Sequence, residues 1–241
     1  MSILNTTVSL GVVASLSLAI AVFIASYITA LCFTPSNRDP QASKQAGYKS
    51  SSTKFFFFYY ANTTAQLMGL YHAILCLNYP TPSSKLCPRP SNISPLLFTW
   101  NPHTVLCLAL IVFAGQVLLS CFTRLGPNFS QDLTPPRSLV TTGPYRWIQH
   151  PSYAASIIIF LTNCALFQRR DGVAACWLPT SVIHGETFGH MMWVGYLGTA
   201  AVGCYALIQR VKSEEAVLRS SFGAEWDIYH KRTKRFIPGL V

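Results

Sequence analysis

Long apolar segments constrain this chain more than any other feature. The first covers residues 8–33, and four more follow at about 55–78, 104–122, 153–167 and 188–209. A helix needs roughly 20 mostly apolar residues to cross a bilayer. Only 11% of the residues are charged, whereas a soluble domain usually carries about 25%. The pattern therefore predicts an all-α, integral membrane helical bundle with about five transmembrane helices.

Basic residues are distributed unevenly between the expected loops. The loops at about 34–54 and 123–152, together with the tail at 210–241, hold 14 of the 18 lysines and arginines. Cytosolic loops of membrane proteins carry such an excess. We therefore expect a lumenal N-terminus and a cytosolic C-terminus. The net charge of +10 is attributed to topology and to contact with anionic lipid rather than to nucleic acid.

The expected lumenal loops contain few residues with distinctive chemistry. The eight cysteines form no CxxC motif and no Cys/His cluster, so metal and redox motifs are unsupported. A Cys76–Cys87 disulfide is one pairing that this side of the membrane allows. Asn92-Ile-Ser is a sequon and hence a candidate glycan acceptor. His72, inside the second apolar segment, is interpreted as a packed polar residue rather than a ligand.

The character of the chain changes after residue 123. Residues 1–123 consist of three expected spans, and we treat residues 124–241 as a separate functional region. There the segment GPYRWIQHPSY at 143–153 places an arginine, a histidine, two prolines and two tyrosines before an apolar helix. Pro151 suits the first turn of that helix, and N–H groups at a helix N-terminus can bind an anion. A simple membrane anchor does not need these residues.

A second polar cluster lies where the last span leaves the lipid. Arg210 and Glu214 are four residues apart and share one helix face, which alone indicates a surface pair worth about 0.2–0.5 kcal/mol. Ionisable groups at membrane depth, however, are costly and tend to be functional. Glu214 and Glu215 could bind an ammonium group or ribose hydroxyls, and a guanidinium matches a carboxylate. An antiparallel hairpin of the last two spans would bring residues 153 and 209 together.

The tail continues with helical spacing beyond the last span. Gly223 is expected to end one helix and to begin another. The tail is amphipathic, basic and aromatic, which is typical of a segment at a membrane surface. We therefore expect a cytosolic C-terminal helical cap.

Several segments, in this order, resemble the isoprenylcysteine carboxyl methyltransferase family. They are RLGPNFS at 124–130, LVTTGPYRWIQHPSY at 139–153, R-x-x-x-E-E at 210–215 and FGAEWDIYHKRTKRFIP at 222–238. The similarity covers roughly residues 124–241. It implies an endoplasmic-reticulum membrane enzyme that uses S-adenosyl-L-methionine to methylate the C-terminal carboxylate of a prenylated cysteine. Prenylated protein C-termini and membrane lipid are then the expected partners.

The resemblance also implies which residues form the site. Arg210 would hold the substrate carboxylate and is the candidate catalytic residue. The implied cofactor-binding residues are Arg137, Ser138, Leu139, Val140, Tyr145, His150, Pro151, Ser152, Tyr153 and Glu214, with Ser130 or Gln131 as a weaker further contact. Gln149 stands where the family usually has arginine. It removes a positive charge near the cofactor carboxylate, which Arg146 or Arg137 would have to replace.

Three other functions share some of these features. A phospholipid N-methyltransferase has a similar C-terminal hairpin and needs a base for its amine, for which Glu215 is a candidate. A sterol reductase resembles the motif set, but it binds NADPH and usually has more spans. A non-enzymatic membrane protein that keeps the fold is a third alternative, because of Gln149. The ending RTKRFIP at 232–238 favours the carboxyl methyltransferase.

Overall fold

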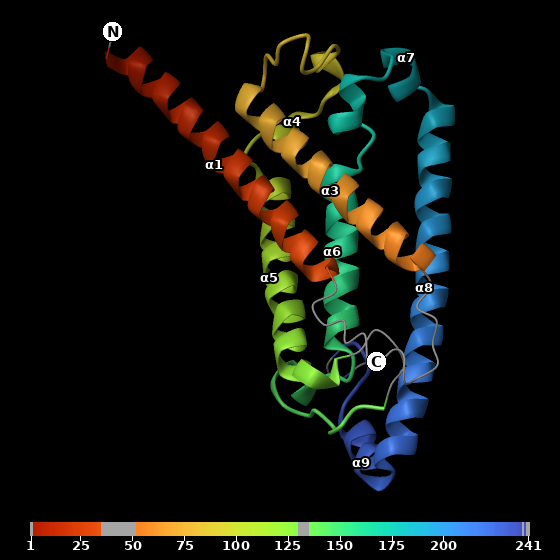
Figure 1. The fold of residues 1–241 in the computed structure, drawn as a ribbon. Coiled ribbons are helices and arrows are strands. Elements are labelled where there is room, and N and C mark those ends of the chain that lie inside the picture. The colour runs from red at the N-terminus through yellow and green to blue at the C-terminus, as the bar shows by residue number, and fades with distance from the viewer. Residues whose placement is uncertain (1, 35–51, 130–134, 238, 240–241) are drawn as a thin grey trace. The chain divides into compact units, whose positions relative to one another are not determined.

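The computed structural model describes residues 2–34, 52–129, 135–237 and 239, and the side chains of 2–10 and 52–61 are left out of the description (Figure 1). Over these ranges the chain is helical, as expected, with an isolated parallel bridge between Ile148 and Lys234 and no named strand. The α-helices are α1 (Ser2–Phe33), α3 (Ser52–Asn78), α4 (Pro95–Phe98), α5 (Pro102–Leu125), α6 (Pro151–Phe167), α7 (Thr180–Ile183), α8 (Glu186–Phe222) and α9 (Ala224–Arg232). Short 3-10 turns are η1 (Pro90–Asn92), η2 (Gly126–Asn128), η3 (Gly143–Arg146) and η4 (Val173–Cys176).

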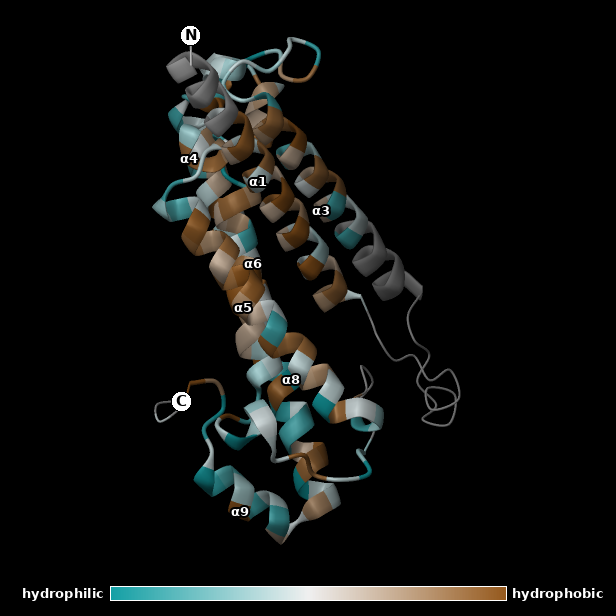
Figure 2. Ribbon diagram, turned by 90° about the vertical axis from the view of Figure 1, so that its left-hand side faces the viewer, coloured by the Kyte–Doolittle hydropathy of each residue, from teal (hydrophilic) through white to brown (hydrophobic). Residues whose placement is uncertain are grey.

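Three segments in the described ranges are long and apolar enough to cross a membrane. They are Gly11–Phe33, Pro102–Asn128 and Glu186–Phe222, and they correspond to the first, third and fifth expected spans. The helix α6 is apolar but has only 17 residues. Figure 2 shows apolar residues along α5 and α6 and hydrophilic residues in α9. The second and fourth spans stay predictions.

The chain divides into two compact units. The first comprises residues 1–31, 61–113 and 159–197, and the second comprises residues 32–60, 114–158 and 198–241. The helices α5, α6 and α8 therefore contribute residues to both units. The functional division expected after residue 123 stays a prediction.

The core of the first unit contains a buried histidine. His72 on α3 is fully buried, and its Nε2 lies 2.8 Å from the carbonyl oxygen of Leu97. Its ring packs against Phe98 at a centroid distance of 4.6 Å and edge-on against Phe167 at 5.4 Å. The interpretation of His72 as a packed polar residue is confirmed.

A disulfide joins the two expected lumenal loops within the first unit. Cys87 is bonded to Cys176, 89 residues further along the chain, with their Cα atoms 4.7 Å apart. The backbone N–H of Arg89 also donates to the carbonyl of Cys176 over 3.2 Å. The alternative Cys76–Cys87 pairing is wrong, because Cys87 is bonded to Cys176 and Cys76 is a buried free thiol.

Asn92 lies beside this disulfide and has a structural role. Its side-chain amide donates to the carbonyls of Ala175 over 3.1 Å and of Leu178 over 3.0 Å. Its Oδ1 accepts a hydrogen bond from the hydroxyl of Thr180 over 3.0 Å. Because Asn92 is only 4% exposed, a glycan on its nitrogen is incompatible with this fold. The expectation of a glycan acceptor at Asn92 is therefore wrong for the folded chain.

The second unit is organised by turns that the sequence marks. Gly223 has φ +49° and separates α8 from α9, as expected. Gly143 has φ +63°, and a Cβ there would lie 3.2 Å from Nε of Arg124. The left-handed region favours glycine because it has no Cβ. Pro151 is the first residue of α6, which confirms its predicted place at the start of that helix.

We predict that Cys87→Ser lowers the stability of the folded protein by about 2–5 kcal/mol, because the disulfide restricts a long loop in the unfolded chain. Thermal unfolding of purified protein measures this loss, and peptide mapping without reductant should recover residues 87 and 176 linked. Cys204→Ser, at an exposed free thiol, is the control. Equal melting temperatures for the two variants would show that no such bond stabilises the fold.

Candidate functional site

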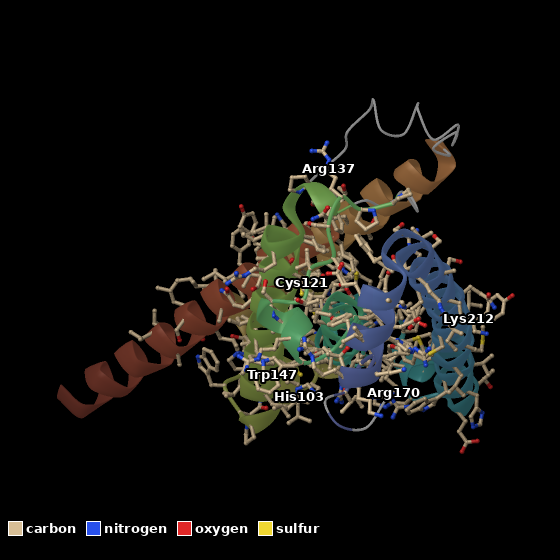
Figure 3. The ribbon with its side chains drawn as sticks, turned by 90° about the horizontal axis from the view of Figure 1, so that it is seen from below. His103, Cys121, Arg137, Trp147, Arg170 and Lys212 are labelled. Carbon is tan, nitrogen blue, oxygen red and sulfur yellow. A yellow bond between two sulfur atoms is a disulfide. The ribbon has the colours of Figure 1, made fainter. Side chains whose placement is uncertain are left out.

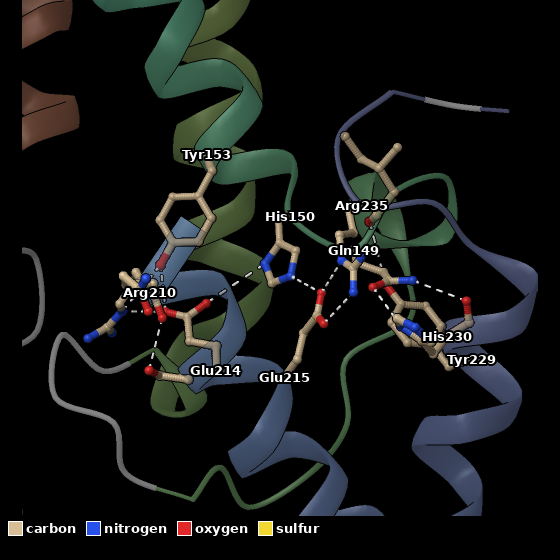
Figure 4. A network of polar contacts seen from close by, with 12 residues as sticks. Gln149, His150, Tyr153, Arg210, Glu214, Glu215, Tyr229, His230 and Arg235 are labelled. Atoms are coloured by element: carbon tan, nitrogen blue, oxygen red, sulfur yellow. Dashed lines mark hydrogen bonds and ion pairs between the residues drawn. The ribbon is translucent and has the colours of Figure 1, made fainter. Parts of the chain in front are cut away.

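The first polar cluster of the second unit lies between α6 and α8 (Figure 4). Tyr153 donates from Oη to Oε1 of Glu214 over 2.5 Å. Arg210 donates from Nε to the same carboxylate oxygen over 2.7 Å and to Oη of Tyr153 over 3.4 Å. The two helices thus form the hairpin that the sequence predicts. It brings Tyr153, Arg210 and Glu214 into direct contact.

His150 lies between the two carboxylates of α8. Its Nδ1 is 3.8 Å from Oε2 of Glu214, and its Nε2 is 3.5 Å from Oε1 of Glu215. The side chain is 6% exposed, and within the described part of the chain its Nε2 has this contact to Glu215 but no direct hydrogen bond. Such buried nitrogen atoms are rare in folded proteins. His150 is therefore a candidate contact for a ligand.

Glu215 has a different partner from Glu214. Arg235 donates from Nε to Oε1 of Glu215 over 2.6 Å and from a terminal nitrogen to Oε2 over 2.8 Å. This hydrogen-bonded fork raises the pKa of Arg235, while burial alone would lower it. The fork also favours the ionised form of the carboxylate, because an adjacent opposite charge stabilises it.

Residues 234–236, after α9, fold back against the segment before α6. The backbone N–H of Gln149 donates to the carbonyl of Lys234 over 2.7 Å, and that of His150 donates to the carbonyl of Arg235 over 2.9 Å. The ring of Phe236 lies 5.9 Å from the ring of His150, centroid to centroid. The tail is therefore part of the site.

Gln149 faces this tail and not the cluster around Arg210. Its side chain donates to the carbonyl of Thr233 over 2.8 Å and is 5% exposed. The guanidinium carbon of Arg146 lies 5.6 Å from the ring centroid of Trp147. That Arg146 or Arg137 replaces the missing charge stays a prediction.

Tyr145, buried in the turn η3 before α6, contacts the half-buried Ser152 in the first turn of α6. The carbonyl of Tyr145 accepts a hydrogen bond from Oη of Tyr229 over 2.7 Å. Burial is the main cause that raises the pKa of Tyr145, and the nearby thiol of Cys121 raises it further. The hydroxyl of Tyr145 also contacts the side chain of Ser152. Pro151 is fully buried as well. These residues support the backbone around His150.

The loop at residues 137–140 is anchored separately. Oδ1 of Asn128 accepts hydrogen bonds from the backbone N–H of Arg137 over 2.8 Å and of Ser138 over 3.3 Å. Arg137 is exposed, and Figure 3 shows its side chain at the periphery. Leu139 and Val140 are half-buried.

The structure therefore brings together only part of the expected site. Within the described ranges, no hydrogen bond or ion pair joins residues 137–140 to His150 or Glu214. Ser130 and Gln131 lie outside the described residues. The cofactor roles of residues 137–140, 130 and 131 stay predictions.

Sequence reasoning missed the specific roles of Arg235 and Phe236. Both lie in RTKRFIP at 232–238, which the family resemblance included as a motif without assigning contacts. Their partners are far away along the chain, so no local spacing indicates them. The motif itself was the available signal.

In the described residues, the fold and the site define a helical chain with helices long and apolar enough to cross a membrane, and with a polar cluster at the start of one apolar helix. Residues 106–185 match the family model of the isoprenylcysteine carboxyl methyltransferase (ICMT) family. This range includes His150 and Tyr153 and confirms the resemblance there. It supports a methyltransferase of the isoprenylcysteine type. No curated protein matches the chain significantly.

We predict that Arg235→Gln destabilises the protein by about 1 kcal/mol, because it breaks a bidentate pair to a carboxylate that is only 14% exposed. Thermal unfolding at low and high salt measures the effect. Arg219→Gln is the control: it removes a pair to Asp227 whose side chains are 71% and 43% exposed, and it should change stability by almost nothing. If both variants unfold at the wild-type temperature, the Glu215 pair adds no stability.

Proposed function

We propose that the chain is an S-adenosyl-L-methionine-dependent methyltransferase that esterifies the C-terminal carboxylate of a prenylated cysteine. One observation carries this proposal. The family match over residues 106–185 contains the segment of His150 and Tyr153, and α6 and α8 place this segment against Arg210 and Glu214.

The polar side chains of the site fit a cofactor with an ammonium group and ribose hydroxyls. Oε2 of Glu214 lies no closer than 3.8 Å to His150, so it can accept a hydrogen bond from either group. The buried Nε2 of His150 lies 3.5 Å from Oε1 of Glu215 and makes no direct hydrogen bond in the described chain. When bound, S-adenosyl-L-methionine supplies an electrophilic methyl group. Glu214, His150 and Tyr153 would hold the cofactor.

The expected acceptor explains why an arginine is needed and a base is not. A C-terminal carboxyl group in water ordinarily has a pKa of about 3.3–3.7, so it is an anion at neutral pH. Arg210 would bind and orient this carboxylate, and exclusion of water would raise its reactivity. The Nε edge of Arg210 is held by Glu214 over 2.7 Å, which fixes the direction of the guanidinium.

Methylation of a lipid amine fits the same geometry less well. An amine acceptor must lose a proton, and Glu215 is the base that the sequence suggests for it. Both carboxylate oxygens of Glu215 accept hydrogen bonds from the guanidinium of Arg235. A carboxylate paired in this way is a poor proton acceptor. The arrangement therefore favours the carboxylate substrate.

We place this enzyme in the endoplasmic-reticulum membrane, with its N-terminus in the lumen and its C-terminus in the cytosol. The excess of basic residues in loops 34–54 and 123–152 and in the tail supports this orientation. The Cys87–Cys176 disulfide supports it independently, because disulfides persist in oxidising compartments. A site at the membrane surface would receive the prenyl chain from the lipid, and the C-terminal segment would face prenylated proteins in the cytosol.

We predict that Arg210→Ala abolishes methyl transfer while cofactor binding largely survives, because the carboxylate loses its cationic partner. The assay supplies labelled S-adenosyl-L-methionine and N-acetyl-S-farnesylcysteine to membranes that contain the protein, and it scores base-labile label. Arg219→Ala, at an exposed arginine of the same helix, should retain activity. Normal turnover by Arg210→Ala would remove this role from Arg210. Absence of label in wild-type protein that binds the cofactor would redirect the search to lipid amines.

We predict that Glu214→Ala weakens cofactor binding by about tenfold, since one hydrogen bond to a charged group contributes about 1.5–3 kcal/mol. Equilibrium binding of labelled S-adenosyl-L-methionine to purified protein measures this change. Glu225→Ala, on the exposed first turn of α9, is the matched control and should bind like wild type. Unchanged affinity in Glu214→Ala would exclude Glu214 from the cofactor site. NADPH in place of the labelled cofactor tests the reductase alternative.

A further inference from the structure

Both polar atoms of the Gln149 side chain form hydrogen bonds with residues of the C-terminal segment. Its Nε2 lies 2.8 Å from the carbonyl oxygen of Thr233, 3.2 Å from Oγ1 of Thr233 and 3.2 Å from the carbonyl oxygen of His230. Its Oε1 lies 3.1 Å from Nδ1 of His230.

These partners define the orientation of the amide. The Nε2 atom faces two carbonyl oxygens, which can only accept hydrogen bonds, so the reversed amide would place oxygen against oxygen. The Oε1 atom must then accept from His230, which requires a hydrogen on Nδ1 of that ring. Oγ1 of Thr233 donates to the carbonyl of Tyr229 over 2.7 Å, so it can accept from Gln149.

The contacts of Gln149 continue directly into the site. The carbonyl of Lys234 accepts a hydrogen bond from the backbone N–H of Gln149. The carbonyl of Arg235 accepts one from the backbone N–H of His150. The side chain of Arg235 then pairs with Glu215, and Phe236 lies against the ring of His150. The position of His150 therefore depends on how the tail is held.

We propose that Gln149 is a positioning residue that fastens the segment Thr233–Phe236 onto His150 and thereby fixes His150 between Glu214 and Glu215. Its effect on catalysis rests on the proposed function, whereas its effect on the tail does not. Gln149 acts through the tail and touches no reacting atom.

An arginine at position 149 could not make the same contacts. Its guanidinium donates hydrogen bonds and accepts none, so it could still meet the carbonyl of Thr233. It would lose the hydrogen bond from Nδ1 of His230 and would place a positive charge next to that N–H. Gln149 and His230 thus form a matched pair in this chain.

The test compares Gln149→Leu and Gln149→Arg with Gln116→Leu, an equal substitution at an exposed position of α5 in the same unit. Hydrogen–deuterium exchange of the peptide with the amides of residues 149 and 150 reports on tail docking without any turnover. We expect Gln149→Leu to speed exchange of these amides by about tenfold or more, because several hydrogen bonds of about 0.5–1.5 kcal/mol each are lost. Gln149→Arg should lie between this variant and wild type.

A second measurement separates positioning from simple stability. The KM for S-adenosyl-L-methionine should rise by about tenfold in Gln149→Leu and less in Gln149→Arg, and Gln116→Leu should match wild type. If Gln149→Leu exchanges these amides as slowly as Gln116→Leu, the proposal that Gln149 holds the segment Thr233–Phe236 is overturned. Faster exchange with unchanged KM and kcat would overturn the positioning role and leave a structural contact. If wild-type protein transfers no methyl group, the exchange data still decide whether Gln149 holds the segment Thr233–Phe236. The dissociation constant of labelled cofactor then replaces KM as the second measurement.

Discussion

Two consecutive carboxylates on one helix, each with its own arginine, impose the main constraint on the site. Glu214 binds Arg210 and Tyr153, and Glu215 binds Arg235. Charges that leave water are tolerated only when they are paired and hydrogen-bonded. Neighbouring residues on a helix point in different directions, so the two pairs extend towards different segments. His150 lies in the space between them.

This constraint makes the tail a structural part of the site. The pair between Glu215 and Arg235 joins α8 to the segment after α9, and backbone hydrogen bonds join the same segment to residues 149 and 150. The helix α9 lies where the sequence predicts a helical element after the last span, while its role as a cytosolic cap stays a prediction. A surface role is compatible with the exposed side chains of Trp147 and Ile228. The inner face of the cap, in contrast, is occupied by contacts with the site.

Features that depend on nearby residues were predictable. The start of α6 at Pro151 follows from the fixed φ of proline, and the break at Gly223 follows from its access to positive φ. The pair between Arg210 and Glu214 follows from helical spacing. The contact between Tyr153 and Arg210 needed one further step, the antiparallel hairpin. Each of these expectations uses the period of a helix or the geometry of a single residue.

Partners that are distant along the chain were not predictable in this way. Cys87 pairs with Cys176 across 89 residues, and its nearer candidate, Cys76, is buried in the core. Asn92 matched a sequon, yet its amide is used by three backbone or hydroxyl groups of another loop. Gln149 looked like a missing charge, and it is a buried hydrogen-bonding residue. A sequence pattern gives the residue type but not the distant segment that its side chain contacts.

The sequence by itself determined that this chain is helical, that several of its helices are apolar enough for a membrane, and where the polar clusters lie along it. Composition and periodicity suffice for these properties because they depend on burial of apolar surface and on local backbone geometry. The tertiary structure alone decided that Glu215 meets Arg235 and that the tail holds His150. Those choices depend on the packing of segments that are about 20 to 90 residues apart, where many pairings satisfy the same local rules.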